Sequence, residues 1–194
     1  MAASPLYRSL LAAVGLVVCA PDLAPAADVG LYARRMERSA PMAVRGTTLA
    51  PFAYILFCRK NPGDCQAGGP AVAEAEAEVL ATVRRINRSV NARIKGRVDD
   101  ERDLWEVGTA SGDCEDFALT KRRQLIAAGL PASSLRMAVA TTREGDGHAV
   151  LVFHTTAGNF VLDNRTDAIL PWNRTGLSWI KMASADNPKV WNAL

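Results

Sequence analysis

Clustered positive charge is missing from this 194-residue sequence, which has a formal net charge of only +3 and no block of Lys and Arg with interleaved aromatic residues. Because a phosphate backbone is bound by such clusters, we expect no nucleic-acid partner. Histidine and cysteine are scarce, with two and four residues, so chemistry that needs them depends on few positions. What is present, 49% hydrophobic and 22% charged residues, is typical of one globular core, and the length suits one domain plus an export segment.

The first 26 residues have the features of a secretory signal peptide. Arg8 is the positive N-terminal charge, residues 9–20 form an apolar run of about a dozen residues that is too short to cross a bilayer, and Ala24-Pro25-Ala26 fits the small-x-small cleavage rule. We therefore predict a signal peptide over residues 1–26, cleaved beside Ala26 or Ala27, and a periplasmic or secreted mature protein. The alternative is a membrane anchor that is not cut.

Cysteine usage supports export and singles out one thiol. Cys19 is a possible lipid-attachment site, although Val18 before it is larger than the residue usually found there. Cys58 and Cys65 bracket a turn-rich loop, and in an oxidising compartment we expect them to form a disulfide bond. Because cleavage of the signal peptide removes Cys19, Cys114 is then left as a free thiol, which is either buried and inert, the commonest fate of a lone cysteine, or reactive.

Hydrophobic periodicity predicts helices first and strands afterwards. Apolar residues close to a 3.6-residue period predict an amphipathic helix over residues 71–94, and a second helix is expected from Cys114 to Ala128. Helices followed by an antiparallel meander predict an α+β fold. The other expected segments are a signal peptide (1–26), an N-terminal arm (27–49), a single domain (50–194), a short apolar segment (52–57), a loop (97–111) and strands at 135–142, 148–154, 159–163 and 178–182.

Cys114 and His148 are the candidates for chemistry. Cys114 stands at the start of a predicted helix, where unpaired N–H groups and the helix dipole favour a thiolate. His148 begins a predicted strand after a glycine-containing loop, a usual place for a functional side chain, although it could also be a hydrogen-bonded core residue. His154 is about 20 Å further along the same strand, so both histidines cannot reach one thiol, and we expect His154 at the surface or the strand end.

Asp163 is predicted to lie beside His148 through the register of a hairpin. If Thr155 pairs with Gly158, Asp163 becomes the diagonal neighbour of His148 on the same face of the sheet. A three-residue turn would instead place the two on opposite faces. An aspartate beside an imidazole fixes its tautomer and stabilises its charged form, whereas the alternative for Asp163 is a turn residue ahead of Asn164.

Three acidic residues, Asp113, Glu115 and Asp116, flank the thiol. Their charge alone would raise the pKa of Cys114 and oppose thiolate formation. They are either acids at a helix N-terminus, which is common, or ligands of a bound cation that offsets their charge. A set of oxygen ligands without nitrogen or sulfur points to calcium.

Three motifs in this order resemble the bacterial transglutaminase-like cysteine peptidases: GDCEDFA at 112–118, GHAVL at 147–151 and VLDN at 161–164. The segments DLW at 103–105 and Phe57-Cys58 are also similar, and the resemblance covers about residues 50–175. It implies a papain- and transglutaminase-like fold, in which the helix that begins with the catalytic cysteine packs on an antiparallel sheet.

The resemblance also implies roles. Cys114, His148 and Asp163 would form a catalytic triad, and the N–H of Cys114 with Trp105 would form an oxyanion hole. Relatives include periplasmic, calcium-dependent proteases that clip surface adhesins, in which acids at the positions of Asp113 and Glu115 bind calcium; no organic cofactor is implied. The implied partners are a protein or peptide substrate, such as a cell-surface protein, and an inner-membrane regulator.

Three functions follow from these observations. The first is an exported cysteine endopeptidase that works through an acyl-enzyme intermediate. The second uses the same triad with an amine as acceptor and is a protein-glutamine transglutaminase or an amidase. The third is a non-catalytic periplasmic binding module.

Overall fold

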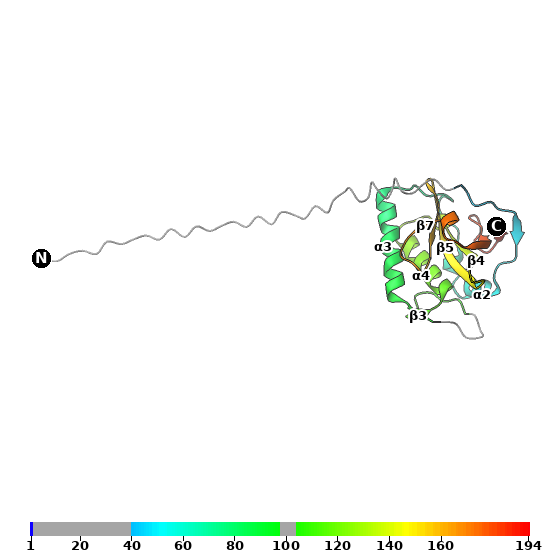
Figure 1. Cartoon of the computed structure of the whole chain (residues 1–194), viewed down its shortest axis with the longest axis horizontal. Coiled ribbons are helices and arrows are strands. Elements are labelled where there is room, and N and C mark those ends of the chain that lie inside the picture. The colour runs from blue at the N-terminus through cyan, green and yellow to red at the C-terminus, as the bar shows by residue number, and fades with distance from the viewer. Residues whose placement is uncertain (2–39, 98–103) are drawn as a thin grey trace.

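The computed structural model describes Met1 and residues 40–97 and 104–194. The predicted signal peptide with Cys19, most of the predicted arm, and Asp103 lie outside these described residues. In the part described, helices pack on one antiparallel sheet, which confirms the α+β class (Figure 1). Helix α4 lies between α3 and the central strand β5, so that it connects the helical layer to the sheet.

The α-helices of the described residues are α2 (Phe52–Lys60), α3 (Ala77–Arg93) and α4 (Cys114–Ala127). Helix α4 packs on the sheet, and α3 packs on α4. Helix α2 was expected only as a short apolar segment, but it buries Tyr54, Phe57 and Cys58 along one face. Helix α3 begins six residues later than predicted because Ala73 makes a parallel bridge with Thr155. The N–H of Ala73 donates to the carbonyl of His154, and the carbonyl of Ala73 accepts from the N–H of Thr156, each at 3.0 Å.

The main sheet has the order β1-β9-β8-β4-β5-β6-β7, and all its pairs are antiparallel. The predicted strands are present, but β8 pairs with β4 on the side away from β5, so the sheet is not a simple meander. Strands β2 and β3 form a short parallel pair at the two ends of the segment 97–111, which was expected to be only a loop. The strands are β1 (Gly46–Thr48), β2 (Lys95–Gly96), β3 (Ser111–Gly112), β4 (Leu135–Thr141), β5 (Gly147–Thr155), β6 (Gly158–Leu162), β7 (Leu170–Pro171), β8 (Ser178–Ala183) and β9 (Trp191–Ala193).

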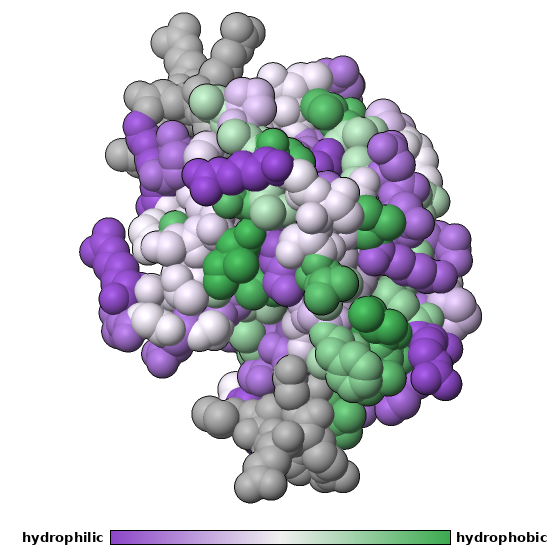
Figure 2. All heavy atoms as spheres, turned by 90° about the vertical axis from the view of Figure 1, so that its right-hand side faces the viewer, coloured by the Kyte–Doolittle hydropathy of each residue, from purple (hydrophilic) through white to green (hydrophobic). Residues whose placement is uncertain are grey.

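Strand β5 is buried on both faces, which explains its nearly continuous apolar sequence. Leu151 and Phe153 point into the core between sheet and helices, whereas Val150 and Val152 belong to a smaller cluster on the other face. On the face shown in Figure 2, apolar side chains stand in small groups among polar ones. The large apolar side chains that stay exposed among the described residues include Leu49, Phe52, Ile55, Ile180 and Val190. Scattered exposure of this kind is ordinary on a protein surface.

The structure forms the expected disulfide bond between Cys58 and Cys65 and leaves Cys114 as a free thiol. The disulfide loop is tied to α4 by the buried guanidinium of Arg122, which donates to the carbonyls of Asp64 and, at 3.3 Å, Gln66. Within the described residues, none of the helices combines the length and apolar character that a membrane span requires.

Candidate active site

The N-terminus of α4 is shaped by a glycine and a buried carboxylate. A Cβ atom added to Gly112 would lie 2.0 Å from Oδ2 of Asp116, so only glycine lets this side chain fold back over the helix start. Oδ1 of Asp116 then accepts a 2.7 Å hydrogen bond from the N–H of Glu106. The N–H of Gly108 donates to Thr120 at 2.8 Å, so α4 holds the 104–108 segment at two points.

Cys114, the first residue of α4, is half-buried against β5. Its sulfur accepts a 3.2 Å hydrogen bond from the N–H of Ala149, and its thiol donates to Oε2 of Glu115 at 3.2 Å. Burial and the adjacent charge of Glu115 raise the pKa of Cys114 far above its usual range. The resting side chain in this geometry is therefore the neutral thiol.

His148 and Asp163 form a buried pair one residue from that backbone contact. The hairpin pairs Thr155 with Gly158, and in this register Nε2 of His148 lies 3.0 Å from Oδ1 of Asp163. Burial raises the pKa of Asp163, but hydrogen bonds from His148 and from Arg165, whose Nη2 is 2.9 Å from Oδ2, outweigh it and hold the pKa below its usual value. Asp163 is therefore ionised at neutral pH.

The three predicted triad residues are thus brought to the same end of strands β5 and β6, but their contacts are unequal. Within the described residues, no hydrogen bond joins the Cys114 sulfur to the His148 ring, and the link between the two passes through Ala149. Such catalytic contacts are often loose before substrate binds. Because Nε2 of His148 is engaged by Asp163, Nδ1 is the nitrogen left to face a thiol.

His154 corrects one sequence prediction. It was expected at the surface or the strand end; it lies at the end of β5, as the second alternative had it, but it is only 6% exposed, and its Nε2 lies 3.3 Å from the sulfur of Met182. Burial lowers the pKa of His154 to about 3, so this ring is neutral at physiological pH. The surface alternative was wrong because residues that cover this end of β5, such as Met182, come from distant parts of the sequence.

Trp105 lies in the segment that Asp116 and Thr120 hold, and it is nearly buried. Its ring packs edge-on against Tyr54, with centroids 5.6 Å apart. This contact makes Trp105 part of the core, and its role as an oxyanion donor stays a prediction.

Asp113, Glu115 and Asp116 have ligand oxygens within 4.8 Å of one another. The sequence resemblance assigned only Asp113 and Glu115 to calcium, and the structure adds Asp116 to this group. Burial and a hydrogen bond with Asp113 raise the pKa of Glu115 to about 9, so the carboxylates favour a shared proton or another positive charge at neutral pH. Close, buried oxygen ligands of this kind fit a calcium ion.

Sequence reasoning missed two contributors to the site. One is the N–H of Ala149, a backbone group that no side-chain pattern can reveal. The other is Arg165, which also donates its backbone N–H to Oδ1 of Asp163 at 2.9 Å; the spacing of two residues in an Asx turn could have indicated it.

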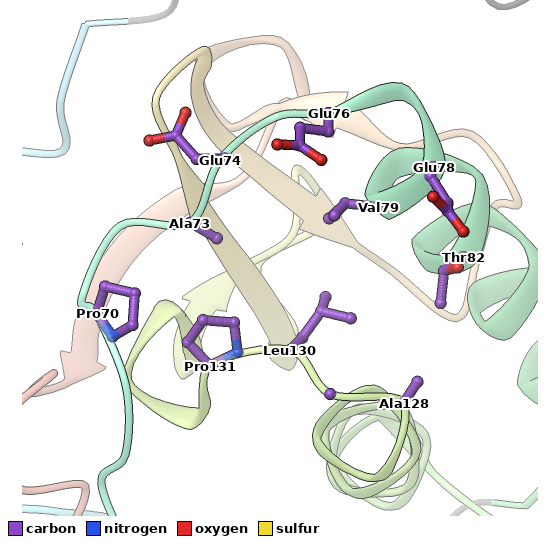
Figure 3. Close-up of a pocket in the computed structure, with 11 residues that line it drawn as sticks. Pro70, Ala73, Glu74, Glu76, Glu78, Val79, Thr82, Ala128, Leu130 and Pro131 are labelled. Atoms are coloured by element: carbon purple, nitrogen blue, oxygen red, sulfur yellow. The ribbon is translucent and has the colours of Figure 1, made fainter.

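A separate pocket of about 340 Å³ lies at the other end of α4 (Figure 3). It is lined by residues 128–131, by the segment before α3 and by the first turns of α3, and Glu74, Glu76 and Glu78 are among the lining residues. Because Cys114 is at the opposite end of the same helix, this pocket is not part of the candidate active site.

A cysteine at the start of a helix that packs on an antiparallel sheet, with a histidine–aspartate pair on that sheet, defines the papain- and transglutaminase-like class of thiol hydrolases. The family model described as bacterial transglutaminase-like cysteine proteinase BTLCP matches residues 44–194, and the chain belongs to this family. It is therefore a transglutaminase-like cysteine peptidase that acts on protein or peptide substrates.

Solved structures of LapG from Legionella pneumophila have the same fold. One is 27% identical over 59% of this chain and 69% of that chain, with a TM-score of 0.53. A calcium-bound structure of LapG is 21% identical over 86% and 87% of the two chains, also with a TM-score of 0.53. No curated protein matches the sequence.

Proposed function

We propose that this chain is an exported cysteine endopeptidase whose catalytic triad is Cys114, His148 and Asp163. The observation that carries the proposal is the buried His148–Asp163 pair, 3.0 Å apart, one residue from the N–H that contacts the Cys114 sulfur. If His148 were only a core residue and Asp163 only a turn residue, nothing would require them to lie beside Cys114, the only free thiol of the described residues.

The proposed reaction begins with the neutral thiol. Nδ1 of His148 accepts the proton of Cys114 while the sulfur attacks the peptide carbonyl carbon, and Asp163 stabilises the imidazolium that forms. The imidazolium then returns the proton to the amine as the C–N bond breaks, which leaves a thioester on Cys114. Water adds to this thioester with His148 as base, releases the carboxylate product and restores the thiol.

We further propose that Asp113, Glu115 and Asp116 hold a calcium ion. The ion would supply positive charge that offsets the carboxylates which, together with burial, raise the pKa of Cys114. The buried, closely spaced oxygens support this proposal, as does the calcium-bound structure of LapG.

The cellular setting that we propose is the periplasm, with a cell-surface protein as substrate and an inner-membrane protein as regulator. The signal-peptide features of residues 1–26 and the disulfide bond support export. The motif resemblance to adhesin-clipping proteases supports the substrate class.

Alkylation of Cys114 by iodoacetamide tests the triad. We expect native protein to be alkylated there, and His148→Ala to slow the reaction at neutral pH by about 10²-fold or more because the base is lost. Asp146→Asn, an exposed change two residues away, serves as the matched control and should keep the wild-type rate. Equal alkylation rates for wild type and His148→Ala would contradict the triad.

Calorimetric titration with calcium tests the metal site independently of activity. Wild-type protein should bind calcium, and Glu115→Gln should weaken the affinity at least about tenfold because a charged oxygen ligand is lost. Glu78→Gln on the exposed face of α3 should bind as wild type does. The calcium proposal, though not the triad, fails if Glu115→Gln binds calcium with unchanged affinity.

A further inference from the structure

Asp163 lies just beyond the ladder that holds β6 in the sheet. The last pair between β5 and β6 joins Leu151 to Leu162, and β6 pairs with β7 only at Phe160 and Val161. Among the described residues, the backbone of Asp163 therefore has no strand partner to fix its position, although its carboxylate must meet the His148 ring.

The outer side of this segment borders a pocket. The pocket has a volume of about 210 Å³ and is lined by Asp163, Arg165 and Thr166 among others. Arg165 is itself exposed, so its ion pair with Asp163 joins the acid to a surface side chain rather than to the core.

The inner side of the segment is held by two asparagines, one turn apart on α3. The two N–H groups of Asn91 Nδ2 are shared among three acceptors: the carbonyl of Asp163 at 3.2 Å, the carbonyl of Thr166 at 3.1 Å and Oδ1 of Asp167 at 2.9 Å. Nδ2 of Asn87, which is fully buried, donates to the carbonyl of Asp167 at 3.2 Å. Asn91 thus reaches both the triad acid and the turn that follows it.

The chemistry of this contact requires a donor. All three groups around Nδ2 of Asn91 are acceptors, so an aspartate here would meet two carbonyls and a carboxylate with oxygen alone. Because α3 packs on α4, the same contact connects the acid through the helical layer to the helix that begins with Cys114.

We propose that Asn91 is a positioning residue of the active site, which holds the backbone of Asp163 so that its carboxylate stays in register with His148. This proposal rests on the proposed triad. A shift of the acid by about 1 Å is enough to cost roughly 10²-fold in rate, so the loss of one anchor has a measurable effect.

The test combines Asn91→Ala with Asp163→Asn in a double-mutant cycle, read out as the alkylation rate of Cys114 by iodoacetamide. We expect Asn91→Ala to slow alkylation roughly 10- to 100-fold in the wild-type background and to have little further effect when Asp163→Asn is already present. Ser89→Ala, an exposed change on the same helix, should leave the rate unchanged. Should Asn91→Ala fail to fold in a thermal unfolding scan, Asn91→Gln, which keeps the amide but displaces it by one methylene, takes its place.

Two outcomes overturn the inference: a folded Asn91 variant with the wild-type rate, or equal slowing in both backgrounds, which indicates a general structural role. Failure of the triad itself has a different signature, because His148→Ala would then alkylate as fast as wild type. The cycle therefore separates loss of the positioning role from loss of the proposed function.

Discussion

Replacing Asp163 with Asn is expected to lower the turnover of a cleaved protein substrate by about 10³- to 10⁴-fold, the size of effect seen when a triad acid becomes an amide. The amide carries no charge to stabilise the His148 imidazolium. The amide must also accept hydrogen bonds from Arg165, which donates to both carboxylate oxygens of Asp163 in the wild-type protein. An amide that turns its oxygen toward Arg165 presents its NH₂ group to Nε2 of His148, which would favour the wrong tautomer.

The matched control is Asp186→Asn, which removes one carboxylate from an exposed loop away from the site. It should keep wild-type turnover. Thermal unfolding of both variants shows whether each is folded at the assay temperature. A folded Asp163→Asn variant with turnover close to wild type would show that the acid does not serve His148.

Replacing Lys121 with Met is expected to make the folded protein more stable at pH 7, by about 1–4 kcal/mol, as when other buried charges are replaced by apolar residues of similar size. Lys121 is fully buried on α4, and its Nζ has no hydrogen-bond partner among the residues that the structure describes. Burial lowers the pKa of Lys121 to about 7, although the charges of Asp163 and Asp167 oppose the shift.

The same pKa shift predicts a pH dependence of stability. Between pH 7 and the usual lysine pKa of about 10.4, the unfolded chain binds more protons than the folded one, so the free energy of unfolding rises with pH. The penalty from Lys121 is largest below pH 7 and disappears as the pH approaches the unfolded value. Lys121→Met should therefore flatten this rise.

Urea denaturation at pH 7, 8 and 9 measures both effects. Lys189→Met, at an exposed position, is the control and should keep the wild-type slope with pH. A Lys121→Met variant that is less stable than wild type at pH 7 would contradict the prediction, because it would mean that the ammonium contributes favourable interactions in the fold.

Local sequence signals predicted much of the fold. The start of α4 at Cys114 agrees with its predicted start, and strands β4, β5, β6 and β8 agree with prediction to within a residue or two. The start of α3 was wrong because the Ala-Glu tract has helical propensity, whereas Ala73 gains two backbone hydrogen bonds to β5 that only the folded chain offers. The arm was also assigned no strand, yet β1 lies within it and pairs with β9 from the other end of the chain.

The order and spacing of residues determined the family, the disulfide bond and the candidates for chemistry, because hydrophobic period, turn residues and motif order act over short stretches of chain. The tertiary structure decided which strands lie next to β4, that His154 is buried, and that Asn91, Arg165 and the N–H of Ala149 surround the candidate triad. These contacts join segments that are distant in sequence or involve backbone groups. They depend on the packing of α3, α4 and the sheet, which no local pattern encodes.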